Sequence, residues 1–92
     1  MSQNPFKVVP TKSFLKDLKS VQSKVPPAQS KRIYKAIQGL EQNPHQGKKL
    51  VGIQSGVWRI RIGDYRIRYD IEGSTVILHT IRHRKDVYKK IH

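Results

Sequence analysis

The sequence predicts an α+β domain in which two N-terminal helices pack on a small antiparallel sheet. Apolar residues recur every three to four positions in the first half of the chain, which is the period of a helix. From Lys48 onward they recur at every second position, which is the period of a strand. At 92 residues the chain has room for one domain with a modest core, so we expect residues 1–92 to form a single unit.

The helical half of the chain begins with a short strand. Residues 6–9 form an apolar run that Pro10 closes, which is typical of a first or edge strand. Thr11 is the expected N-cap of the first helix. Pro26 and Pro27 end that helix and open the second, because proline is tolerated in a first turn. The apolar stripes are Phe14, Leu15, Leu18 and Val21 in the first helix, and Ile33, Ala36, Ile37 and Leu40 in the second.

The strand half of the chain predicts three consecutive strands. Gly63-Asp64 and Gly73-Ser74 are typical turn sequences, and such short turns join neighbouring antiparallel strands. We therefore expect a meander, with the first strand of the chain at one edge of the sheet. The expected strands are 57–62, 65–71 and 75–81, followed by a polar tail of one or two helical turns at 85–92.

The strand pattern places positive charge on one face of this sheet. Trp58, Ile60 and Ile62 supply an apolar face for the helices, and Tyr65 and its alternate neighbours extend it. The opposite face then gathers four guanidinium groups. Like charges on facing strands repel each other, so such a face is easier to explain if phosphate or carboxylate binds to it. These residues are Arg59, Arg61, Arg66 and Arg68, with Asp70 as the one acid among them.

The overall composition agrees with an anionic partner and excludes several kinds of protein. Lysine and arginine number 19 against 6 aspartates and glutamates, a net charge of +13, which favours nucleic acid or an acidic protein as partner. There is no cysteine, and therefore no disulfide framework, thiolate zinc site or cysteine nucleophile. No apolar run approaches the roughly 20 residues that span a bilayer, and no signal pattern begins the chain, so we expect a cytoplasmic protein without membrane contact.

Most catalytic constellations are not supported by the sequence. The six acids form no evident pair for acid–base or two-metal chemistry, and no glycine-rich phosphate loop is present. His79 and His83 lack an evident third ligand, so we expect neither metal nor cofactor. His79 itself lies in an apolar run and is expected to be packed and hydrogen-bonded.

Metal-free RNA cleavage remains possible, because the substrate supplies its own 2′-hydroxyl as nucleophile. Arginines would stabilise the charge that develops on the phosphate. Arginine stays protonated and is a poor base, so Tyr88 or a histidine such as His83 is the better candidate for proton transfer.

Three segments together resemble the RelE/ParE superfamily of type II toxin–antitoxin toxins, closer to its RelE side. They are residues 49–52 with 56–69, which include the run Trp-Arg-Ile-Arg-Ile-Gly-Asp-Tyr-Arg, then 75–81, and finally His-Arg-Lys-Asp-Val-Tyr at 83–88. The resemblance implies a RelE-like β-α-α-β-β-β fold. It also implies a metal-independent endoribonuclease that cleaves mRNA in the ribosomal A site and inhibits translation. A cognate antitoxin would wrap the toxin in a hetero-oligomer, and the charge of this chain predicts that the wrapping segment is acidic.

The resemblance also assigns roles to individual residues. Arg59, Arg61 and Arg66 match the basic positions of the strands, and Arg84, or else Arg82, matches the C-terminal arginine. Tyr88 matches a tyrosine implicated in stacking or proton transfer. The best-known members carry lysines where this chain has Arg59 and Arg61, so we assign these two to charge stabilisation rather than to a base role. The further expected RNA contacts are Arg68, Arg82, His83, Lys49, Lys31, Arg32 and Lys35.

Two alternatives stay open at this point. The first is a ParE-like protein that binds DNA gyrase, although this chain keeps the C-terminal residues that such proteins tend to lack. The second is a non-catalytic homologue that only binds antitoxin or RNA, which the all-arginine site keeps plausible. For the charges on the second helix, an ordinary solvated face is the default explanation, and contact with ribosomal RNA is the alternative.

Overall fold

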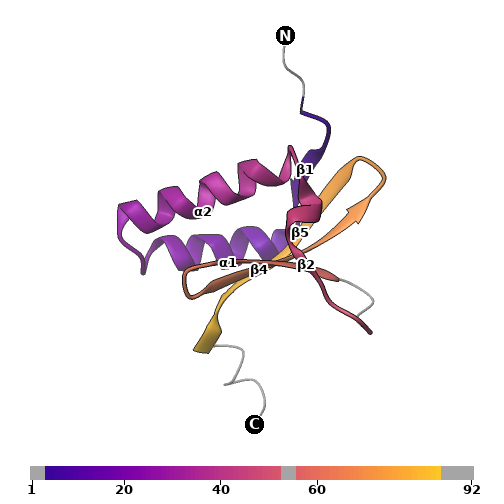
Figure 1. Cartoon of the computed structure of the whole chain (residues 1–92). Helices are drawn as coiled ribbons and strands as arrows, with labels where there is room; N and C mark the ends of the chain where they lie inside the picture. Colours follow the sequence, from indigo (N-terminus) through magenta and orange to yellow (C-terminus); the bar gives the residue numbers. More distant parts are fainter. Residues whose placement is uncertain (1–3, 53–55, 86–92) are drawn as a thin grey trace.

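A computed structural model describes residues 4–52 and 56–85 of the chain (Figure 1). It confirms the predicted α+β class, with two helices packed on one sheet. Part of the expected C-terminal tail, residues 86–92, lies outside the described residues. The elements are β1 (Lys7–Pro10), α1 (Lys12–Gln22), α2 (Pro27–Leu40), the 3-10 turn η1 (Pro44–Gln46), β2 (Lys48–Lys49), β3 (Trp58–Ile62), β4 (Tyr65–Glu72) and β5 (Thr75–His83).

The sheet contains the predicted meander and one strand at each side of it. Its order is β1-β5-β4-β3-β2, and the pairs β3–β4 and β4–β5 are antiparallel as expected. The pairing of β1, which the sequence left open, is parallel to β5, with Lys7 opposite Thr75. A parallel pair needs a long crossover, and the two helices form part of it. The short strand β2 was not predicted; it extends the sheet beside β3.

Both helices begin where the sequence indicated. The Thr11 side chain accepts a hydrogen bond from the Phe14 N–H (3.1 Å), which is N-cap geometry, and its hydroxyl donates to the Leu78 carbonyl (2.9 Å). Thr11 therefore joins the start of α1 to strand β5, which lies between β1 and β4. Pro27 is the first residue of α2. In the described part of the chain, no helix is long and apolar enough to cross a membrane.

The core lies between the helices and one face of the sheet. Both helices lie on the same side of the strands (Figure 1), and neither of them covers the other face of the sheet. Phe14, Ile33 and Leu40 supply the helical part of the core. The predicted stripe of α1 is wrong at Leu15, which is 51% exposed and lines an apolar groove of about 460 Å³ between α1, α2 and β1. From the sheet come Ile62, Tyr65, Ile67, Tyr69, Val76, Leu78 and Ile81.

A β-bulge interrupts the pairing of β4 with β5. Arg68 lies opposite Thr80, but the next residue, Tyr69, lies opposite Leu78, so His79 is the extra residue. A bulge of this kind resets which side chains face which side of the sheet. The buried residues of β5 are accordingly spaced by two and then by three, at positions 76, 78 and 81. His79 and Thr80 thus both lie by the face that the helices leave open.

Candidate nucleic-acid interface

The uncovered face of the sheet carries two rows of cations. Residues paired across antiparallel strands share a face, so the strand register shows which side chains meet. One row runs from Lys48 through Arg59 and Arg68 to Thr80, and the neighbouring row runs Arg61, Arg66, Arg82. We call these cations the arginine face: Lys48, Arg59, Arg61, Arg66, Arg68 and Arg82.

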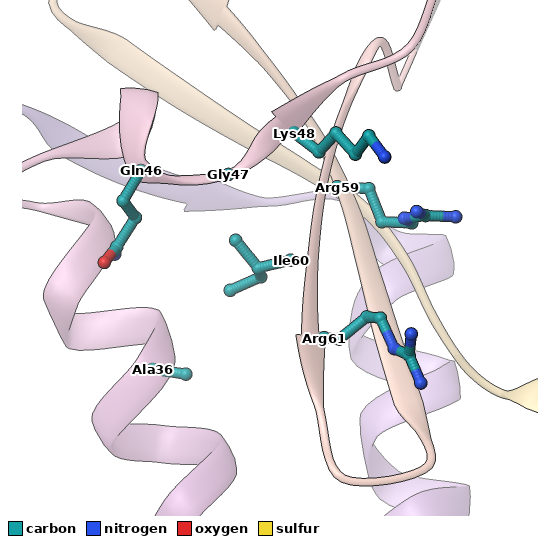
Figure 2. A pocket seen from close by; sticks show the side chains of 7 residues that line it. All are labelled: Ala36, Gln46, Gly47, Lys48, Arg59, Ile60 and Arg61. Atoms are coloured by element: carbon teal, nitrogen blue, oxygen red, sulfur yellow. The ribbon is translucent and has the colours of Figure 1, made fainter.

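The outer edge of this face borders a cavity. Figure 2 shows Lys48, Arg59 and Arg61 pointing to one side of β3, while Ile60 points the other way, towards α2. The cavity measures about 480 Å³ and is lined by these four residues and by Ala36, Gln46 and Gly47. Because β2 pairs only with the first two residues of β3, the rest of that edge is left open to the cavity.

Gly47 allows the chain to pass close to β3 at this point. A Cβ on Gly47 would lie 2.8 Å from the Arg59 carbonyl oxygen and 2.9 Å from the Ile60 side chain, and it would also collide with the Tyr69 hydroxyl. No residue with a side chain fits there without displacing backbone. Because Gly47 has no side chain, the backbone comes close enough to β3 for Lys48 to pair with Arg59.

The arginines crowd one another electrostatically. The pKa of Arg59 is lowered by partial burial and then by the charges of Arg66, Arg61 and Arg68. The Nε of Arg66 is buried and, within residues 4–52 and 56–85, has no hydrogen-bond partner. A buried donor without an acceptor is costly, and an anionic ligand would relieve both the lost hydrogen bond and the repulsion.

One arginine of the face is held by a carboxylate. Asp17 reaches from α1 to β5, where it accepts a hydrogen bond from the Ile81 N–H (3.3 Å) and lies 3.6 Å from Nε of Arg82. β1 pairs only with the first half of β5, so Asp17 caps a backbone donor that no strand covers. Among the described residues, this is the only ion pair with a carboxylate on the arginine face.

Asp70, the acid that the sequence placed among the arginines, is occupied by other groups. Its carboxylate accepts hydrogen bonds from the N–H groups of Gly56 (3.0 Å) and Val57 (3.2 Å) and lies 2.6 Å from Nε2 of His79. Burial alone would raise the pKa of Asp70, but these contacts outweigh it and lower the pKa. The expectation that His79 is hydrogen-bonded is confirmed. Asp70 thus orients a loop and an imidazole rather than forming an ion pair with an arginine.

The other basic residues expected to contact RNA fall in different places. Arg84 follows β5 with its side chain exposed, and its N–H donates to the Asp64 carbonyl (2.8 Å). Arg82, by contrast, lies directly opposite Arg66 on the arginine face. Lys49 pairs with Trp58 and so shares the face that the helices cover, whereas its neighbour on the arginine face, Lys48, was not predicted. That residue could be found only from the register of a strand too short to predict.

The remaining candidates lie away from the arginine face. His83 pairs with Tyr65 on the helix-covered side, where its ring packs edge-on against that of Tyr65 and its Nε2 is 3.9 Å from the Asp64 carboxylate. Tyr88 lies outside the described residues. Within the described ranges, no three histidines or acids come together in a way that could hold a metal ion. The exposed basic residues of α2 are Lys31, Arg32 and Lys35.

Comparison with known proteins identifies the class to which this fold and this basic sheet belong. Residues 8–88 match the family described as ParE toxin of type II toxin–antitoxin system, parDE. The chain belongs to that family, within the RelE/ParE superfamily, and is the toxin of a type II toxin–antitoxin pair.

Individual relatives come from both branches of the superfamily. The chain is 34% identical over 88 residues to Toxin RelE3 of Methanocaldococcus jannaschii, covering 89% of this chain and 94% of the relative. The RelB-RelE antitoxin-toxin complex from Methanococcus jannaschii matches with a TM-score of 0.70 at 32% identity, over 91% of this chain and 99% of that one. The RelBE2 complex from Mycobacterium tuberculosis matches with a TM-score of 0.70 at 28% identity, over 87% and 99%. The chromosomal ParDE system from P. aeruginosa shares the fold, with a TM-score of 0.66 at 14% identity, over 88% and 98%.

Proposed function

We propose that this toxin is a ribosome-dependent, metal-independent endoribonuclease that cleaves mRNA in the ribosomal A site. The observation that carries the proposal is the arginine face, where five guanidinium groups lie in two adjacent rows and one carboxylate, Asp17, forms an ion pair within the described chain. Arg66 is central to it, because its buried Nε has no hydrogen-bond partner among the described residues. The likeness to Toxin RelE3 and to RelE structures supports the RelE-type activity over a gyrase-directed one.

In this proposal the arginines bind the scissile phosphate and stabilise the negative charge that builds on it. Arg61, Arg66 and Arg82 form one row across three strands, so a phosphate above Arg66 receives hydrogen bonds from several directions. Asp17 fixes Arg82 in that row. Arg84 and Tyr88, which the family resemblance marks, complete the site from the C-terminal segment in the same proposal.

The test is to map mRNA 5′ ends in a reconstituted translation reaction, with and without ribosomes. We expect cuts inside A-site codons that require ribosomes, and we expect Arg66→Ala to lower the cleavage rate by about 10²–10³-fold, as the loss of one charge-stabilising donor does in other enzymes. Lys24→Ala is the matched control, because it removes the same charge from an exposed position between the helices. Testing Arg82→Ala beside Arg84→Ala shows which C-terminal arginine contributes more.

Three results would contradict the proposal, each in a different way. Intact mRNA together with inhibited DNA supercoiling by gyrase would replace the proposal with the gyrase-directed alternative. Intact mRNA, unaffected gyrase and no growth arrest on expression would leave a binding-only homologue. Cleavage that Arg66→Ala leaves unchanged would remove the arginine face from the site.

The proposed partner is a cognate antitoxin with an acidic segment. The solved structures of the Methanococcus jannaschii and Mycobacterium tuberculosis relatives are toxin–antitoxin complexes, and a chain of net charge +13 attracts an acidic chain most strongly. Carboxylates placed over the arginine face would neutralise the site and exclude mRNA from it.

A further inference from the structure

RNA cleavage through the 2′-hydroxyl needs a proton acceptor, and the six cations of the arginine face supply none. Arginine remains protonated and cannot serve. His83 is on the opposite face, and His45 packs between the rings of Phe6 and Trp58 on the helix side. Among the described residues, His79 is the one histidine that lies by the arginine face. Imidazole is the side chain that most readily exchanges protons near neutral pH.

The contacts of His79 are those of an oriented base. Its Nε2 is 2.6 Å from the Asp70 carboxylate, so Nε2 carries the proton and donates it, which leaves the lone pair on Nδ1. Among the described residues Nδ1 has no hydrogen-bond partner. The N–H groups of Gly56 and Val57 hold the Asp70 carboxylate in place. The carboxylate therefore fixes the orientation of the imidazole. A carboxylate that sets the tautomer and direction of a histidine is the arrangement that activates such a base.

The surroundings of His79 also suit a ribose next to a phosphate. The side chain is 30% exposed and lines a cavity of about 360 Å³ with Arg68, and the other lining residues contribute hydroxyls and backbone. Arg68 is two positions from Arg66 on β4, roughly 7 Å along the strand. A phosphate bound between these arginines places its adjoining ribose beside the cavity. The charged groups facing His79 are Asp70 and Arg68; Thr11, Ser13, Gly56 and Thr80, which complete the lining, carry no charge.

We infer that His79, oriented by Asp70, is the general base of the cleavage reaction, an inference that rests on the proposed endoribonuclease function. The 2′-hydroxyl oxygen attacks phosphorus while its proton passes to Nδ1 of His79. The O2′–P bond forms and the P–O5′ bond breaks, which yields a 2′,3′-cyclic phosphate. The departing 5′ oxygen takes a proton from water. The β5 bulge is what brings His79 to this face.

The experiment measures single-turnover cleavage on ribosomes with a defined A-site codon, across pH 5.5–8.5. For the wild type the rate should rise with pH, because a general base acts only in its unprotonated form. His79→Gln, which can still donate to Asp70 but cannot accept a proton, should lower the rate by about 10²–10⁴-fold and abolish that rise. His45→Gln is the control and should change neither. An mRNA with a 2′-deoxy residue at the cut site should bind the wild type and His79→Gln equally.

Each outcome decides the inference. A wild type that does not cleave removes the proposed function and this inference with it. A wild type that cleaves, with His79→Gln unchanged in rate or pH profile, overturns the inference alone. If His79→Gln loses binding of the deoxy mRNA or fails to fold, Asp70→Asn decides: a slower rate supports the base role, because the imidazole is still present but no longer oriented, and an unchanged rate refutes it. An NMR spectrum of the neutral wild-type imidazole should show its proton on Nε2, and a proton on Nδ1 would contradict the assignment.

Discussion

Replacing Tyr69 with phenylalanine removes one hydroxyl from the middle of the core. The side chain of Tyr69 is fully buried, and its hydroxyl donates to the carbonyl of Pro44, itself a buried residue (2.5 Å). In Tyr69→Phe that carbonyl stays buried without its donor, which costs about 1–3 kcal/mol. For a domain of this size each kcal/mol lowers Tm by roughly 4–8 °C, so we expect a decrease on the order of 10 °C.

The same hydroxyl makes stability depend on pH in the alkaline range. Burial raises the pKa of Tyr69 to about 12, and the Gly47 backbone only partly opposes this. In the unfolded chain the phenol loses its proton near pH 10, roughly the ordinary value for tyrosine. Between these two values the unfolded state binds fewer protons than the folded state, so stability falls as pH rises. The contribution of Tyr69 is complete below about pH 10 and is lost through pH 12, a decrease of about 2–3 kcal/mol.

The assay is urea denaturation of the wild type and Tyr69→Phe at steps from pH 8 to 11. The phenylalanine variant should be less stable at pH 8, and the difference between the two proteins should shrink as pH rises above 10. Tyr34→Phe is the control, because Tyr34 is 46% exposed on α2 and its replacement should change stability by less than about 0.5 kcal/mol. Equal stability of wild type and Tyr69→Phe at pH 8, or a difference that stays constant with pH, would refute the reasoning.

Three further predictions follow from the fold and the charge. Gly47→Ala should destabilise the protein by about 1–3 kcal/mol in urea titrations, because the new Cβ lies 2.8 Å from the Arg59 carbonyl; an unchanged midpoint would contradict this close approach. Thr11→Ala should cost about 1 kcal/mol or more by thermal denaturation, since Phe14 N–H loses its cap, and full stability would show that the cap is dispensable. The affinity for a 2′-deoxy mRNA strand, measured by fluorescence anisotropy, should fall steadily from 50 to 300 mM salt, and a flat affinity would exclude phosphate binding by the arginine face.

The sequence predicted the elements well because their signals are local. The N-cap at Thr11, the prolines that separate the helices and the glycine turns of the meander each depend on a few adjacent residues. The arginine face was also predictable in outline, because alternation along two strands joined by a tight turn needs no knowledge of distant parts of the chain. Leu15 belongs to the predicted apolar stripe of α1 but is exposed, because that stripe covers a wider arc of the helix than the arc that contacts the core.

The features that could not be predicted from the sequence depend on how segments far apart in the chain pair and pack. Lys48 joins the arginine face only because a two-residue strand pairs with β3. Asp17 and Arg82 are 65 residues apart in the chain, and they come together only because α1 crosses the open edge of β5. His83 lies on the face opposite the arginines because it pairs with Tyr65. None of these pairings leaves a mark on neighbouring residues, so composition and period could not reveal them.

The position of His79 depends on a bulge that the sequence indicates only in part. The buried residues Val76, Leu78 and Ile81 are spaced two and then three apart, and that spacing in a strand indicates a bulge. It was masked by Ile77, whose apolar side chain made the segment look like a continuously buried strand. Without the bulge, strict alternation from Leu78 would move Ile81 out of the core and Arg82 off the arginine face. The extra residue therefore lets one strand serve the core and the arginine face together.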